Sequence, residues 1–226
     1  MDNKNIDTDH FLKHPEIKDL FDRTLQELIE ESDRGAVIIG ADIADSQLRK
    51  LLELFMSESL SNNKRSSLLD YPGPLCAFSA KADVALAFDF ISTRTNNCLH
   101  ALRKIRNKAA HSNLNFKLND CSQLLREMYN LGDGVPVGIN RWAIDVMFKI
   151  FSSNVLESMK DIEKEIGESP IKTPRDVLDY IADKPELLKP LEDRLPRFEF
   201  SLGLMLLCAI LIHERDSVLK KACKTK

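Results

Sequence analysis

Apolar side chains recur every three or four residues along most of this chain, which is the spacing of one face of an α-helix. The spacing begins after His14, with Ile17, Leu20, Phe21, Leu25, Leu28 and Ile29. The alternation typical of a β-strand occurs only over Leu114, Phe116 and Leu118, a segment too short to build a sheet. The sequence therefore predicts an all-α protein with about seven to nine helices.

Capping residues and glycines indicate where the first helices end. Ser32-Asp-Arg-Gly35 stops one helix and starts a second, expected from about Gly35 to Ser57. Gly40 inside this helix costs about 1 kcal/mol relative to alanine, a cost that close approach of a neighbouring helix would offset. Ser57 to Ser67 is predicted to be a polar loop, and Ser79 is the expected N-cap of a helix from Ala80 to about Ser92.

The C-terminal part of the chain begins at the glycine-rich connector Gly132-Asp-Gly-Val-Pro-Val-Gly138. Four helices are expected after it: about Asn140 to Ile166, Asp176 to Asp183 behind the cap Thr173-Pro174, Pro185 to Arg194, and Arg197 to Lys221. The predicted organisation is a flexible N-terminus (residues 1–13), a helical bundle (14–131) and a C-terminal helical region (132–226) that packs on the same core.

Composition indicates a cytoplasmic protein. Hydrophobic residues make up 43% and charged residues 30% of the chain, as in ordinary soluble proteins. The five cysteines are widely spaced and form no Cys-x-x-Cys pair, which favours reduced, buried thiols. The apolar run Phe198–Ile212 contains Glu199 and is shorter than the roughly 18 to 20 residues that cross a bilayer. We therefore expect no membrane span.

No motif for a metal or a cofactor is present in the sequence. His10 and His14 are four residues apart, but no third ligand lies near them. There is no nucleophile elbow, dinucleotide fingerprint or helix-turn-helix pattern. We expect neither a metal site nor a cofactor.

Most of the chemistry lies in the segment Cys98–His111, here called the motif helix. On a helical wheel, Asn107 and His111 are about 40° apart and point the same way, and Arg103 extends that row by one turn. Arg106 lies about 140° from His111. These two side chains would therefore meet only through a long reach or across two subunits.

Charge distinguishes the region around the motif helix. Between Phe90 and Asn119 there are six basic residues and no acidic one, although the whole chain carries −3, so the remainder carries −9. Basic side chains without acidic partners on their own helix favour an external anion such as phosphate. The alternative is a solvated polar face whose histidine stabilises the helix C-terminus.

The stretch Arg106-Asn-Lys-Ala-Ala-His111 resembles the motif of the HEPN superfamily, helical domains that act on nucleotides and RNA. A longer resemblance, to the mannitol operon repressor family, covers roughly residues 15 to 130. It rests on the order of Asp33-Arg-Gly-Ala-Val-Ile-Ile-Gly-Ala, Leu-Arg-Lys-Leu-Leu-Glu-Leu-Phe55, Gly73-Pro-Leu-Cys-Ala-Phe-Ser-Ala-Lys81 and Ile-Arg-Asn-Lys-Ala-Ala-His111. Both resemblances imply a HEPN-like helical bundle with additional C-terminal helices.

The HEPN resemblance implies a metal-independent endoribonuclease that works as a homodimer. It assigns His111 as general acid or base, Arg106 as the phosphate clamp and Asn107 as the residue that orients them. Histidine suits proton transfer because its pKa lies near neutrality, and arginine donates to two phosphate oxygens at once. From position on the helix we add Arg103, Lys104 and Lys108 as candidate phosphate-binding residues, and His100 as a further candidate.

The repressor resemblance implies a different function, a non-catalytic helical regulator that acts through a protein or small-molecule partner. In this interpretation Asn107 and His111 satisfy buried backbone groups between helices. Direct DNA binding is not favoured, because an acidic chain with one basic patch lacks an extended surface to neutralise phosphates.

Overall fold

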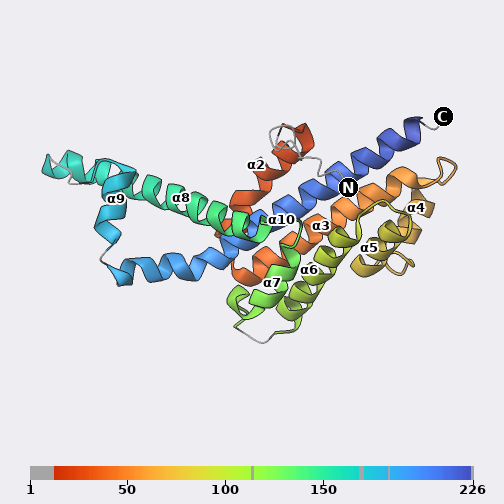
Figure 1. Ribbon diagram of the computed structural model, residues 1–226, viewed down its shortest axis with the longest axis horizontal. Coiled ribbons are helices and arrows are strands. Elements are labelled where there is room, and N and C mark those ends of the chain that lie inside the picture. Colours follow the sequence, from red (N-terminus) through yellow and green to blue (C-terminus); the bar gives the residue numbers. More distant parts are fainter. Residues whose placement is uncertain (1–12, 113–114, 168–170, 183, 225–226) are drawn as a thin grey trace.

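The computed structural model describes residues 13–112, 115–167, 171–182 and 184–224. These ranges form nine α-helices, one 3₁₀ helix and no strand, which confirms the all-α prediction (Figure 1). The elements are α2 (Pro15–Glu30), α3 (Asp33–Phe55), α4 (Asn62–Leu69), α5 (Phe78–Ala87), α6 (Thr93–His111), η1 (Leu118–Cys121), α7 (Ser122–Met128), α8 (Val135–Ile166), α9 (Pro174–Ile181) and α10 (Pro185–Lys224). Most of the predicted flexible N-terminus, and Leu114 of the predicted extended segment, lie outside the described residues.

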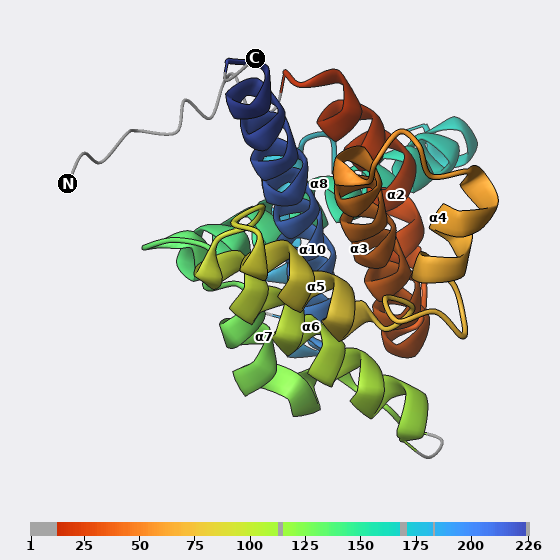
Figure 2. The same cartoon turned by 90° about the vertical axis from the view of Figure 1, so that its right-hand side faces the viewer.

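Helix α3 begins at a capped N-terminus and continues with small buried residues. The Ser32 hydroxyl accepts a hydrogen bond from the Gly35 N–H at 3.0 Å, which caps the helix. A Cβ atom placed on Gly40 would lie 2.5 Å from Cδ2 of Leu204 in α10. The predicted close approach of a neighbouring helix at Gly40 is therefore confirmed, and α2, α3 and α10 run side by side (Figure 2).

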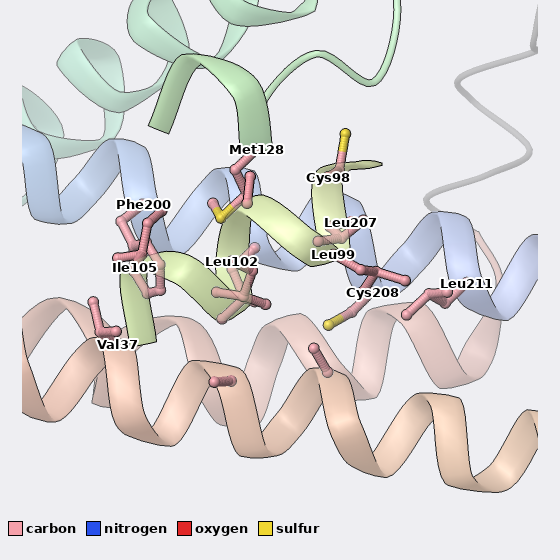
Figure 3. Close-up of a cluster of buried hydrophobic side chains, with 14 of the residues drawn as sticks. Val37, Cys98, Leu99, Leu102, Ile105, Met128, Phe200, Leu207, Cys208 and Leu211 are labelled. Carbon is pink, nitrogen blue, oxygen red and sulfur yellow. The ribbon is translucent and has the colours of Figure 1, made fainter. Parts of the chain in front are cut away.

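The main core lies where α10 packs against α3 and the motif helix, which forms most of α6 (Figure 3). Helix α10 presents one fully buried face to this core, made of Phe200, Leu204, Leu207 and Leu211. It meets Val37 of α3 and Leu99, Leu102 and Ile105 of α6. Each such side chain contributes about 1.5–3 kcal/mol through burial. Helix α10 therefore belongs to the same core as the motif helix.

The second half of α8, together with α9 and the start of α10, extends away from the bundle and is here called the arm (Figure 1). The N-terminus of α9 has a capping box between Thr173 and Asp176, so the predicted cap at Thr173-Pro174 is confirmed. Apolar side chains of the arm remain exposed, among them Ile150, Leu178 and Tyr180.

Several predicted boundaries are wrong, including the start of α8, which begins at Val135 inside the predicted connector and not at about Asn140. The expected loop from Ser57 to Ser67 contains most of α4, which Ser61 caps and Leu69 anchors in the core. Helix α5 starts at Phe78 without a side-chain cap and ends at Ala87, so Ser79 is not its N-cap. Asp89 then adopts a positive φ of 55°, which separates α5 from α6.

The two helices expected between Pro185 and Lys221 are one continuous helix, α10, with Pro190 and Pro196 in its interior. A proline inside a helix costs about 3 kcal/mol, because it removes a hydrogen bond and clashes with the preceding turn. Phe198 and Leu202, which follow Pro196, are almost completely buried. Their burial offsets this cost and explains why the helix continues.

Candidate functional site

Helix α6 is held at both ends by polar contacts from other helices. At its N-terminus, the Ser92 N–H and the Thr95 hydroxyl both donate to Oε1 of Glu214 in α10, each at 2.9 Å. At its C-terminus, the Arg34 guanidinium of α3 donates to the Ser112 carbonyl at 2.9 Å and to its hydroxyl at 3.0 Å. These contacts hold α6 at both ends. The contact between Arg34, near the start of α3, and Ser112, at the end of α6, is consistent with antiparallel packing of the two helices.

A groove of about 600 Å³ lies between α3 and α6. Its α6 wall is formed by Arg103, Arg106 and Asn107, three of the residues that the sequence pattern indicates as candidates. The α3 wall, the segment before α5 and the start of α5 complete the lining with Ile38, Ile39, Ala41, Asp42, Ile43, Asp45, Cys76, Ala77, Phe78 and Ser79. This volume lies within the range of small-molecule sites.

A buried ion pair ties α5 to the α3 wall. Lys81 is only 2% exposed, and its ammonium donates to both carboxylate oxygens of Asp45, at 2.9 and 2.8 Å. It also donates to the Cys76 carbonyl at 3.2 Å. The charge of Asp45 is therefore neutralised where it lines the groove.

The polar side chains of the α6 wall are not engaged by the rest of the described chain. Arg103 is half-buried, and its Nε atom is buried without a hydrogen-bond acceptor in the described part. Arg106 is exposed and Asn107 half-buried, and within the described ranges neither side chain forms a hydrogen bond or ion pair. An unpaired cationic wall on a groove is suited to an anionic ligand.

His111 is the last residue of α6 and does not line the groove. Its side chain is exposed and has no hydrogen-bond partner among the described residues. The helical rise places it about 6 Å beyond Asn107 along the axis. Within one chain, the structure thus brings Arg103, Arg106 and Asn107 to one groove, but not Arg106 and His111.

The other candidate residues lie elsewhere. Lys104 is 4.0 Å from Glu127 of α7, and His100 is 2.7 Å from Asp83 of α5. Lys108 is exposed. Burial raises the pKa of the Cys121 thiol, and the charge of Lys108 acts to lower it. Neither Lys104 nor Lys108 lines the groove.

The expectation that Asn107 and His111 satisfy buried backbone groups is wrong. Neither side chain makes such a bond in the described part of the chain, and His111 is exposed. Ser112, one residue further on, receives the cross-helix contact from Arg34 instead.

Sequence reasoning missed the α3 wall of the groove. Asp42 and Asp45 are three residues apart, so they share one side of α3. This spacing alone does not distinguish a site from a solvated face. Lys81, which neutralises Asp45, is 36 positions away in the chain, and only the folded structure brings the two together.

Other groups with potential chemistry are sequestered or isolated. Burial raises the pKa of the Cys98 thiol to about 11 and that of Cys208 to about 12, so neither is a ready nucleophile. No group of three metal-ligating side chains occurs in the described ranges. Among the described residues one helical stretch, Pro185 to Ala222, is long and apolar enough to cross a membrane, and 67% of its most apolar window is buried inside the molecule.

Comparisons of the chain with family models, with curated proteins and with solved structures gave no match.

Proposed function

We propose that the α6 wall binds the phosphate backbone of RNA and that the protein is a HEPN-like endoribonuclease. The observation that carries this proposal is that Arg106, Asn107 and His111, all on one helix, form no hydrogen bond or ion pair through their side chains in the described part of the chain. A guanidinium and an imidazole that no other described residue neutralises are available to a phosphodiester. The acid-free stretch from Phe90 to Asn119 adds to the positive potential there.

The reaction needs only groups that this helix carries, because RNA supplies its own nucleophile. His111 acts as general base or acid: a base removes the 2′-hydroxyl proton as the 2′-oxygen bonds to phosphorus. The bond from phosphorus to the 5′-oxygen breaks, and an acid protonates the departing oxygen. Arg106 stabilises the charge on the phosphoryl oxygens, and Asn107 orients the phosphate. The products carry a 2′,3′-cyclic phosphate and a 5′-hydroxyl.

The site is completed by a second copy of the chain. Arg106 and His111 are about 7.5 Å apart along the helix axis and about 140° apart around it, so one helix cannot direct both at the same phosphate. Two α6 helices related by a two-fold axis would bring Arg106 of one subunit toward the partner's His111. The exposed ends of both side chains leave this approach open.

Cleavage of single-stranded and structured RNA by the purified protein tests the proposal. His111→Ala and Arg106→Ala should each abolish cleavage, while Arg141→Ala, which removes an exposed cation from α8, should not. Chelators should leave the activity unchanged, and the 3′ ends should be cyclic phosphates. Both α6 variants should keep the wild-type circular dichroism spectrum, because these side chains are not buried.

Mixing the two inactive variants tests the shared site. If subunits exchange, half of the dimers contain one copy of each variant, and each mixed dimer has one intact pair of Arg106 and His111. The mixture should recover about a quarter of the wild-type activity, as the two-fold symmetry requires. A mixture that exchanges subunits yet stays inactive would show that each site is built within one chain.

The second candidate function is the non-catalytic regulator that binds a protein partner. The exposed apolar side chains of the arm favour it, because such surfaces are common at protein interfaces. Protein that leaves every offered RNA intact, while the arm variant Tyr180→Asp loses a partner that the wild type binds, would support the regulator.

A further inference from the structure

The two helical walls of the groove carry opposite charges that do not meet. Arg103 and Arg106 lie on the α6 wall and Asp42 on the α3 wall. No ion pair joins Asp42 to either arginine in the described part of the chain. Asp45 already forms an ion pair with Lys81, at 2.8 Å. Within the described lining, Asp42 is thus the carboxylate whose charge remains unneutralised.

The antiparallel packing of α3 and α6 places Asp42 level with the arginines. Arg34 contacts Ser112, and this contact sets the register of the two helices. Asp42 is eight residues along α3 from Arg34, and Lys104 is eight residues back along α6 from Ser112. Each step covers about 12 Å. Asp42 therefore lies across the groove from the turn that carries Arg103 and Arg106.

This arrangement selects among ligands. A free phosphate is attracted by the arginines but repelled by the Asp42 carboxylate. A ligand that combines an anionic group with N–H donors satisfies both walls at once. Much of the remaining lining is apolar, including Ile38, which is 37% exposed, and Phe78, whose aromatic ring can stack on a planar base.

We propose that the groove binds one nucleotide of the RNA, with its phosphate on Arg103 and Arg106 and its base amine on Asp42. A carboxylate accepts a hydrogen bond from an exocyclic amine such as N4 of cytosine, whereas uracil presents a carbonyl oxygen at that position. Asp42 is thus a specificity residue that favours amine-bearing bases over uracil. This inference rests on the proposed function, because the nucleotide is taken as part of the RNA substrate.

Binding of cytidine 3′-monophosphate and uridine 3′-monophosphate to the full chain, measured by calorimetry, tests the proposal. The wild type should bind the cytidine nucleotide about tenfold more tightly, in line with one good base contact. Asp42→Asn offers the base a donor as well as an acceptor, so the two affinities should come within about twofold. Asp22→Asn, at an exposed site on α2, should keep the wild-type ratio.

Arg103→Ala distinguishes phosphate binding from base recognition. It should weaken the binding of both nucleotides equally and leave the ratio of their affinities unchanged. Equal wild-type affinities for the two nucleotides, no binding of either, or a ratio that Asp42→Asn leaves intact would each overturn the inference. Because binding is measured without turnover, selective binding by a protein that cleaves no RNA supports the inference while the catalytic proposal fails. Conversely, a protein that cleaves RNA but binds the two nucleotides equally would support the catalytic proposal and overturn the inference.

Discussion

Lys81 is a charged side chain that is almost completely buried, and Asp45 supplies the counter-charge that stabilises it there. Its side chain is 3% exposed, whereas that of Asp45 is 31% exposed. Removal of the carboxylate leaves a buried ammonium without a counter-charge, which costs about 3–5 kcal/mol. We expect Asp45→Ala to lower the free energy of unfolding by an amount in this range, measured by urea denaturation.

The converse substitution provides the control. In Lys81→Met an apolar chain of similar length replaces the ammonium, and the partly exposed carboxylate can be hydrated, so the loss should be smaller. Equal losses for the two variants would contradict this account of the pair.

Glu214 makes the stability of the protein depend on pH. Burial raises the pKa of its carboxyl above the ordinary 4.5, although hydrogen bonds from Ser92 and Thr95 act in the opposite direction. A carboxyl with a raised pKa binds its proton more tightly in the folded chain. Its stabilising contribution is therefore complete below pH 4.5 and is lost as the pH rises through the folded-state pKa.

Glu214→Gln keeps the shape of the side chain but cannot ionise. Relative to the wild type, its Tm should rise between pH 4 and pH 7.5, by an amount on the order of 2 °C. Glu16→Gln is the opposite control, because Arg215 lowers the pKa of Glu16. That variant should lose stability relative to the wild type at pH 7.5, and the difference should shrink below pH 4.5.

At the scale of the helix, we expect a Gly→Ala substitution to have opposite effects on stability at two helical positions, Gly203 and Gly138. A Cβ atom on Gly203 of α10 would clash with the buried aromatic ring of Tyr129, which cannot move aside. A Cβ atom on Gly138, in the first turn of α8, meets nothing within 4 Å. Gly203→Ala should therefore lower the free energy of unfolding by about 1–3 kcal/mol.

Gly138→Ala should raise the free energy of unfolding by about 0.5–1 kcal/mol through helix propensity alone. Urea denaturation of both variants measures the two changes in the free energy of unfolding, which should have opposite signs. A Gly203→Ala variant as stable as Gly138→Ala would mean that α7 and α10 do not pack as closely as described.

The sequence predicted helices whose apolar residues show a clear helical periodicity. It was less informative where a structural feature depends on contacts between helices. Periodicity located α6 and placed Arg103, Arg106 and Asn107 on its polar side, but the opposite wall of the groove depends on the register of α3 against α6. Helix α4 was missed because its eight residues are mostly polar, and it is anchored by Leu69 at its end. Two helices were expected between Pro185 and Lys221, but the burial of Phe198 allows α10 to continue past Pro196.

At the scale of the whole molecule, the proposed site requires two chains. Light scattering at tens of micromolar protein should give twice the mass of a single chain. In this dimer we expect α6 to lie near the two-fold axis. An Asn107→Cys substitution on the groove wall, made in a variant whose Cys76 is replaced by serine, tests this placement through distances between spin labels. A monomer at these concentrations would remove the basis for a site shared between subunits.

The packing of α10 has a consequence during protein synthesis. About 100 residues separate the α6 wall from the α10 residues that cover its inner face, such as Leu204 and Leu207. At a translation rate of about 5–20 residues per second, α6 leaves the ribosome at least several seconds before α10. Until then, the apolar side of α6 has no α10 to cover it. The packing behind the α6 wall is therefore completed only after α10 has been synthesised.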